Sequence, residues 1–115
     1  MREIKFRAWD KINGNMLFDV STGTIDIWSN PDGRKANSKD CKFMQFTGFH
    51  DKNGVGIYEG DIVEDTIRQK YEIKWIEEEG NLKAINKENI FRHFRDIQFM
   101  EVIGNIYENP KLLTN

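Results

Sequence analysis

Two Asn-Gly pairs, Asn13-Gly14 and Asn53-Gly54, most constrain what this chain can fold into. Both residues of such a pair tolerate positive φ, so the pair forms a tight turn between two antiparallel strands. Alternating apolar and polar residues flank the first pair, in the segments 4–9 and 16–20. Such alternation is typical of half-buried strands. The sequence therefore predicts a β-hairpin near the start of a mainly β protein.

Further strand signals follow along the chain. Alternating, β-branched and aromatic residues predict strands in the segments 24–28, 43–49, 57–58, 62–63, 69–76 and 99–107. Asn30-Pro31-Asp32-Gly33 predicts a strong turn, and the polar residues 34–42 that follow it predict an exposed loop. Gly60 is expected to bend the chain as it enters the strand at Ile62.

The segment 69–76 carries the clearest strand pattern. Tyr71, Ile73 and Trp75 fall on one face, while Glu72 and Lys74 fall on the other. We therefore expect the three aromatic and aliphatic side chains to lie in the core.

One later stretch has helical spacing instead of alternation. Behind Asn86, a residue type that caps helices well, apolar residues recur at helical intervals at Ile90, Phe91, Phe94 and Ile97. The spacing predicts one short helix near Ile90 to Phe94. Asn109-Pro110 is expected to end the last strand before a tail at 111–115.

Length and composition limit the class of protein. The 115 residues are enough for one domain with its own core, and 38% of them are hydrophobic. The 17 Lys and Arg residues against 19 Asp and Glu give a net charge of -2, which provides no bulk attraction to nucleic acid or to an anionic membrane. Cys41 is the only cysteine, so no intrachain disulfide and no thiolate metal cluster can form. With charged residues at positions 2, 3 and 5, where a signal peptide would be apolar, we expect a cytoplasmic protein without cofactor or membrane partner.

Three segments occur in an order that resembles a known family. They are Phe6-Arg7-Ala8-Trp9-Asp10, the long segment from Met44 through Asp51-Lys52-Asn53-Gly54 to Val63, and the segment from Glu101 to Pro110. Together they resemble the YopX family of phage and prophage proteins. The resemblance implies a single mostly β domain over 1–115, with an N-terminal β region at 1–45, an SH3-like barrel region at 46–110 and a tail at 111–115. It implies no activity and no catalytic residues.

The shared segment from Phe46 to Val63 has a physical explanation that needs no ligand. Asn53-Gly54 supplies a turn, Ile57 and Tyr58 pack on a core, and Asp61 can accept backbone hydrogen bonds after the bend at Gly60. We therefore expect any functional surface in the less patterned stretches, 21–42 and 68–99.

A non-enzymatic phage or prophage accessory protein that acts through protein contacts is the function that these observations favour. Short strands with exposed edges invite pairing, which makes a homo-oligomer one version of this hypothesis. The partner protein is not identified by the sequence.

Nucleic-acid binding is the alternative. Small β-barrels often present basic and aromatic side chains together. Five basic residues could contribute here: Arg68, Lys70, Lys74, Arg92 and Arg95.

A metal-dependent nuclease is the third hypothesis. Pro31-Asp32 precedes Glu72-Ile73-Lys74, and two carboxylates with a nearby lysine can hold Mg²⁺ and polarise water. Glu3-Ile4-Lys5 has the same Glu-x-Lys form, so the motif has low specificity. Cys41, His50 and His93 show no spacing typical of metal ligands.

Overall fold

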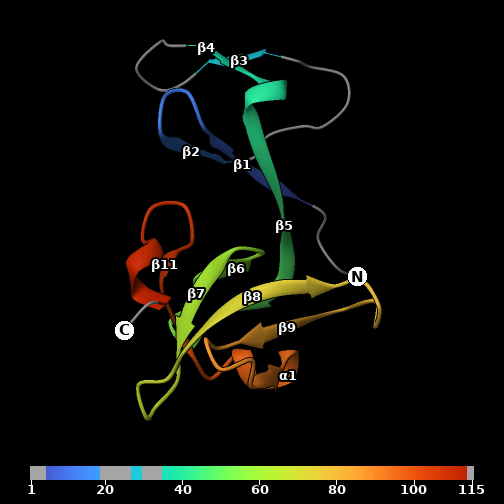
Figure 1. Cartoon of the computed structure of the whole chain (residues 1–115), viewed down its shortest axis with the longest axis vertical. Helices are drawn as coiled ribbons and strands as arrows, with labels where there is room; N and C mark the ends of the chain where they lie inside the picture. Colours follow the sequence, from blue (N-terminus) through green and yellow to red (C-terminus); the bar gives the residue numbers. More distant parts are fainter. Residues whose placement is uncertain (1–4, 19–26, 30–34, 114–115) are drawn as a thin grey trace. The chain divides into compact units, whose positions relative to one another are not determined.

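The structure is a computed structural model that describes residues 5–18, 27–29 and 35–113. Its elements, in chain order, are β1 (Phe6–Asp10), β2 (Asn15–Phe18), β3 (Ile27–Ser29), β4 (Lys35–Asn37), the 3₁₀ helix η1 (Ser38–Asp40), β5 (Cys41–His50), β6 (Gly56–Tyr58), β7 (Asp61–Glu64), β8 (Lys70–Ile76), β9 (Asn81–Ile85), β10 (Phe91–His93), α1 (Phe94–Ile97), β11 (Glu101–Asn105) and the 3₁₀ helix η2 (Pro110–Leu113) (Figure 1). Strands dominate the described part of the chain, and α1 is its one short α-helix. The mainly β fold is confirmed.

The chain forms two compact units, Met1–Phe46 and Thr47–Asn115, and β5 runs from the first into the second. In the first unit β1 pairs antiparallel with β2, as predicted for the Asn13-Gly14 hairpin, and Gly14 has a φ of 70°. On its other side β1 pairs with β5. The small core of this unit contains Ala8 and Leu17.

The prediction of an exposed loop over residues 34–42 is wrong. This stretch contains β4, which pairs with β3, then η1 and the start of β5. Cys41 and Lys42 pair with Asp10 and Trp9 of β1, so the polar sequence gains strand structure from a neighbour distant in sequence. The turn predicted at 30–33 and most of the strand predicted at 24–28 lie outside the described residues.

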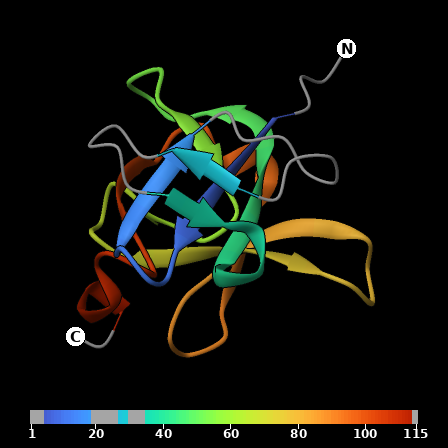
Figure 2. The ribbon, with the colours of Figure 1, turned by 90° about the horizontal axis from the view of Figure 1, so that it is seen from above.

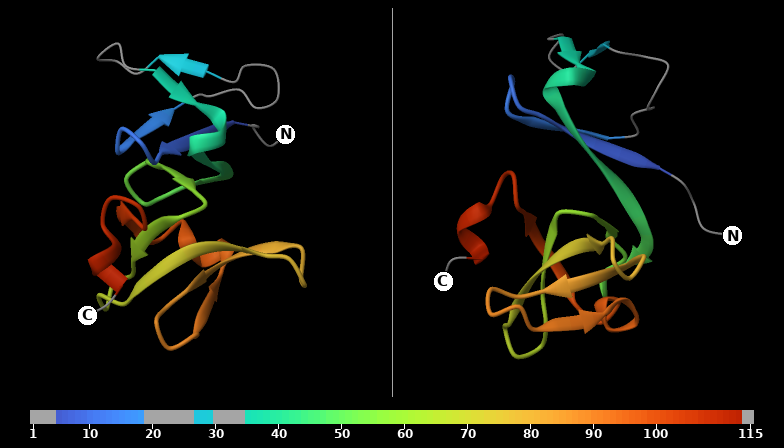
Figure 3. Two further views of the ribbon diagram at one scale, coloured as in Figure 1. Left: turned by 45° about the horizontal axis from the view of Figure 1, so that its top comes forward. Right: turned by 45° about the vertical axis from the view of Figure 1, so that its right-hand side comes forward.

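The second unit is built on a curled five-stranded antiparallel sheet (Figure 3). Strands β7 to β10 form a meander, and β11 returns to pair with β7, giving the order β10-β9-β8-β7-β11. The curl makes this sheet a half-barrel. Within the same unit, β6 pairs with the second part of β5. β8 is the central strand of this sheet, and β7 connects it to β11 by pairing with both.

The core of the second unit lies inside this curl. Its buried side chains are Ile57, Val63, Tyr71, Ile73, Leu82, Ala84, Ile97 and Met100. Tyr71 and Ile73 therefore occupy the predicted face, but Trp75 is 47% exposed, so its expected core position is wrong. Trp75 pairs with Leu82 one step before the last pair of the β8–β9 hairpin. Figure 2 shows that this hairpin extends beyond the rest of the second unit, which explains the exposure.

The predicted helix exists but lies further along the chain. It begins at Phe94, because Phe91 belongs to β10 and pairs with Ile85 of β9. Asn86 does not cap this helix: its Oδ1 accepts the amides of Glu88 at 3.0 Å and Ile90 at 2.9 Å and so fixes the β9–β10 turn.

The last four described residues form η2, within the segment that the sequence assigned in part to a tail. This short helix lies against β8.

Candidate functional site

The residues of the family motif form hydrogen bonds within the fold. Asp51 Oδ1 accepts the amides of Asn53 at 2.8 Å and Val55 at 2.9 Å, and Oδ2 accepts the amide of Val102 at 2.9 Å. Burial alone would raise the pKa of Asp51, but these three donors together with Lys52 lower it. Asp51 thereby holds the 51–54 turn against β11.

The bend that follows is equally structural. Gly60 has a φ of 85°, a conformation that glycine adopts without steric cost. The backbone amide of Tyr58 donates to Asp61 Oδ2 at 2.8 Å. The expected role of Asp61 as a backbone acceptor is therefore confirmed.

Near the end of the motif, Gly104 leaves space for a neighbouring side chain. A Cβ atom at this position would lie 2.5 Å from Asn109 Oδ1, and that same oxygen accepts the amide of Asn105 at 3.2 Å. These contacts explain why glycine and asparagine occur together in this segment.

One candidate surface is a shallow, open pocket of about 310 Å³ in the second unit, which we call the Phe99 pocket. Its lining residues come from the β7–β8 turn, β10, α1 and the residues after α1: Asp65, Thr66, Ile67, Arg92, Asp96, Phe99 and Met100. Ile67 is 70% exposed and Phe99 is 66% exposed. The pocket therefore combines apolar surface with charged groups.

A chain of hydrogen bonds fixes one wall of the Phe99 pocket. Arg92 Nε donates to Tyr71 Oη at 3.3 Å, and that hydroxyl donates to Asp65 Oδ2 at 3.0 Å. The hydrogen bond to Tyr71, its charge interaction and the nearby carboxylates raise the pKa of Arg92 above its usual value. Asp65 Oδ1 also accepts the amides of Ile67 and Gln69. The position of the exposed Ile67 is thus set by the turn beneath it.

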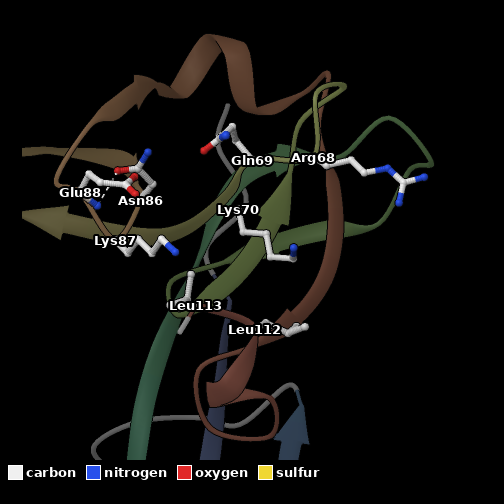
Figure 4. A pocket seen from close by; sticks show the side chains of 8 residues that line it. All are labelled: Arg68, Gln69, Lys70, Asn86, Lys87, Glu88, Leu112 and Leu113. Carbon is white, nitrogen blue, oxygen red and sulfur yellow. Dashed lines mark hydrogen bonds between the residues drawn. The ribbon is translucent and has the colours of Figure 1, made fainter. Parts of the chain in front are cut away.

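A second candidate surface is a polar pocket of about 220 Å³, which we call the Lys87 pocket (Figure 4). It is lined by the β7–β8 turn and the start of β8, by the β9–β10 turn and by η2: Arg68, Gln69, Lys70, Asn86, Lys87, Glu88, Leu112 and Leu113. Three of these side chains are cationic and one is anionic. The pocket therefore carries a local positive charge on a chain whose net charge is -2.

The cations of the Lys87 pocket differ in their surroundings. Lys70 lies 3.7 Å from the Glu64 carboxylate, measured from Nζ to Oε2. Lys87 extends its ammonium group toward the space between the lining residues, whereas Arg68 extends its side chain outward from the opposite side (Figure 4). Arg68 also has a φ of 67°, in the left-handed region.

The structure brings together only two of the five basic residues that the sequence proposed for nucleic-acid binding. Arg68 and Lys70 line the Lys87 pocket, but Arg92 lines the Phe99 pocket. Lys74 pairs with Lys83 across β8 and β9, and Arg95 is an exposed residue of α1. Sequence reasoning missed Lys87, Ile67 and Phe99 because no local pattern marks them; their shared feature is a place in or next to a turn.

The residues of the nuclease hypothesis are only partly described. Asp32 lies outside the described residues, whereas Glu72 and Lys74 share the outer face of β8. Burial raises the pKa of Glu72, and Lys74 opposes this shift. Within 5–18, 27–29 and 35–113, no three His, Cys, Asp or Glu side chains gather where they could hold a metal ion.

Cys41 is half-buried at the start of β5. Burial and the carboxylates of Asp10 and Asp40 raise the pKa of its thiol. A raised pKa leaves less of the nucleophilic thiolate at neutral pH.

In the part of the chain that the structure describes, no helix has the length and apolar character that crossing a bilayer requires.

Comparisons with known proteins identify a family and include similar solved structures. The family model described as YopX protein matches residues 5–114, and the resemblance of the sequence segments is thereby confirmed. Among solved structures, the crystal structure of protein EF1440 from Enterococcus faecalis is similar, with 29% sequence identity and a TM-score of 0.71. The match covers 98% of this chain and 99% of that one. No curated protein matches the sequence.

Proposed function

The chain belongs to the YopX family, and we propose that it is a non-enzymatic accessory protein of a phage or prophage that binds another protein through the Phe99 pocket. The observation that carries this proposal is the position of Ile67 and Phe99. The two side chains come from different turns, are mostly exposed, and line one pocket. The bacterial cytoplasm is the proposed location.

The chemistry of the Phe99 pocket is that of a protein-binding surface. Aromatic residues and arginine are enriched where protein interfaces bind most tightly, at the centre of the contact. Fully burying an exposed Ile or Phe contributes about 1.5–3 kcal/mol each. Arg92 is already oriented by Tyr71, so part of the ordering cost of binding is met before the partner arrives.

The charges around the pocket indicate what kind of partner fits. Asp65 and Asp96 line it together with Arg92, so two carboxylates face one guanidinium. Because opposite charges across an interface favour the correct partner, a partner segment with an apolar side chain next to a basic one fits best. A second copy of this chain is included among such partners, as the homo-oligomer hypothesis requires.

The test is affinity capture with the full chain as bait from cells of the bacterial host. The double variant Ile67→Ser/Phe99→Ser should lose the captured protein. Ile90→Ser is the matched control, because Ile90 is 59% exposed and does not line this pocket. Equal capture by wild type and the double variant would contradict the proposal, and Mg²⁺-dependent DNA cleavage that disappears in Glu72→Ala would contradict its non-enzymatic part.

For the fold we propose that the second unit is an SH3-like barrel. The meander β7 to β10 and the return of β11 beside β7 support this assignment, since they form one curled antiparallel sheet of five strands, the number of strands in a small barrel of this type. The edge strand β10 has three residues, too few to form a long exposed edge. In such a barrel we expect the binding surfaces to lie at the turns that connect the strands.

A further inference from the structure

We propose that the Lys87 pocket binds the phosphate group of a phosphate ester. The pocket lies in the same unit as the Phe99 pocket but shares none of its lining residues. The inference is therefore independent of the proposed protein contact. Its basis is three cationic side chains, Arg68, Lys70 and Lys87, which come from two stretches of sequence and line one pocket together with the η2 residues Leu112 and Leu113.

Two of these cations are available to an anionic ligand. Among the described residues, neither the Arg68 guanidinium nor the Lys87 ammonium group has a hydrogen bond or ion pair. Lys70 is held only by the 3.7 Å contact with Glu64. A phosphate group offers several oxygens, which a lysine approaches as a point charge and an arginine can bind through two parallel hydrogen bonds. The free donors of Arg68 and Lys87 match that chemistry.

The backbone at Arg68 supports a role for its side chain. A φ of 67° is a conformation that glycine adopts readily and that a long side chain adopts rarely. Asp65 fixes the turn itself, because its Oδ1 accepts the backbone amides of Ile67 and Gln69. These hydrogen bonds do not involve the arginine side chain. Arginine thus stands at a position where glycine would suit the backbone better, and what it adds there is an exposed guanidinium.

The remaining lining residues indicate more than a bare anion. Gln69 and Asn86 offer amide groups, and Leu112 and Leu113 border the pocket with apolar surface (Figure 4). The Oδ1 atom of Asn86 is used by the turn, which leaves its amide NH₂ as the donor. A phosphate carried on a sugar or nucleoside could place its phosphate near Lys87 and its less polar part on the leucines. Phosphate esters of this kind occur free or within a nucleic-acid strand.

The spread of the cations bears on which source binds more tightly. Lys87 extends toward the space between the lining residues, whereas Arg68 begins on the opposite side and extends away from that space (Figure 4). One small phosphate ester would contact Lys87, whereas a single strand with successive phosphates could contact all three cations. Three phosphate contacts on a single strand predict an affinity that falls about 20-fold between about 50 and about 200 mM salt.

The experiment is a titration of the ¹⁵N-labelled full chain, followed by the amide signals of Arg68, Gln69 and Lys87. The probes are inorganic phosphate, a nucleoside monophosphate and an oligothymidylate of roughly ten nucleotides, within the usual site sizes for single-strand binding. The proposal expects all three probes to shift these signals. Tighter binding of the oligonucleotide with the stated salt dependence assigns the source to a nucleic-acid strand; equal binding of the monophosphate assigns it to a small ester. No shift with any probe overturns the proposal.

Four variants make the test specific to the pocket. Lys87→Gln should weaken binding of the oligonucleotide about fivefold, and Arg68→Gly should weaken it without lowering the melting temperature, because glycine suits that φ. Glu88→Gln should tighten binding, because it removes the one carboxylate that lines the pocket. Lys52→Gln, an exposed lysine in another turn, is the matched control and should bind as wild type does. Binding by Lys87→Gln that equals wild type overturns the proposal.

Discussion

At the scale of single residues, the recurring device is an Asp or Asn whose side-chain oxygen accepts backbone amides at a turn. Asp10, Asp51, Asp65, Asn86 and Asn105 all act in this way. Such local hydrogen bonds give the backbone an alternative to sheet pairing and so end one strand and start the next. The sequence predicted turns at Asp10 and Asp51 but assigned Asn86 to a helix cap. Asn is favoured both in helix caps and in turns between strands. The pairing of Phe91 with Ile85 shows that the residues after Asn86 continue as a strand, so Asn86 belongs to a turn.

Asp51 gives a prediction about pH. Its pKa is lower in the folded chain than the ordinary value of 3.8, so its carboxylate stabilises the fold above that pH, and this stabilisation is lost as the pH falls through the folded pKa. Asp51→Asn should reduce the free energy of unfolding by about 1–3 kcal/mol at pH 7. The NH₂ group of asparagine would replace Oδ2, and it cannot accept the hydrogen bond that the backbone amide of Val102 donates. Urea unfolding should show this difference shrinking below about pH 4.

The control for Asp51 is Glu101→Gln, which retains an oxygen for the exposed hydrogen bond from Asn53 Nδ2. It should change the free energy of unfolding by less than about 0.5 kcal/mol. A difference between Asp51→Asn and wild type that stays constant from pH 7 to about pH 2 would contradict the assigned role of the carboxylate.

Gly104 gives a prediction about packing. Gly104→Ala would place a Cβ atom against Asn109, displace its side chain and break the hydrogen bond to the Asn105 amide. We expect a loss of about 1–3 kcal/mol in the free energy of unfolding. In a double-mutant cycle, Asn109→Gly should lower the free energy of unfolding by less in the Gly104→Ala background than in the wild-type chain. Additive costs would show that the two residues do not interact.

At the scale of elements, the sequence predicted most strands but missed β4, β9 and β10. Alternation located the strand β8, in which Tyr71 and Ile73 are buried on one face. The hairpin of β1 and β2 was located by its Asn13-Gly14 turn, because in β2 Leu17 is buried and Phe18, on the predicted apolar face, is 59% exposed. Alternation does not indicate how far a core extends along a strand, and it therefore wrongly predicts that Trp75 is buried. It also says nothing of polar strands such as β4, whose structure comes from pairing with β3.

The contrast between Ile73 and Trp75 on the same face of β8 is testable. Ile73 is 1% exposed in the core, so Ile73→Ala should cost about 2–5 kcal/mol in the free energy of unfolding. Trp75→Ala should cost about 1 kcal/mol or less, because Trp75 lies near the end of the β8–β9 hairpin and is not part of the buried core. Urea unfolding monitored by circular dichroism gives both values, and equal costs would contradict the burial described for β8.

At the scale of the whole molecule, neither candidate surface is continuous in sequence. The Phe99 pocket joins residues 65–67 to 92–100, and the Lys87 pocket joins residues 68–70 to 86–88 and 112–113. The sequence predicts a functional surface in the less patterned stretches 21–42 and 68–99, and both pockets take some of their lining residues from 68–99. The sequence could not indicate which turns lie next to one another, because the order of the strands in the sheet and the position of η2 against β8 determine this.

The Phe99 pocket is the proposed protein-binding surface of this YopX family member. The most direct measurement is the dissociation constant of the captured partner for the wild-type chain, Phe99→Ser and the control Ile90→Ser, determined by calorimetry. A central aromatic anchor contributes at least about 2 kcal/mol to binding, so Phe99→Ser should raise the dissociation constant more than about tenfold. Ile90→Ser should leave it unchanged. A dissociation constant for Phe99→Ser equal to that of wild type would contradict the account.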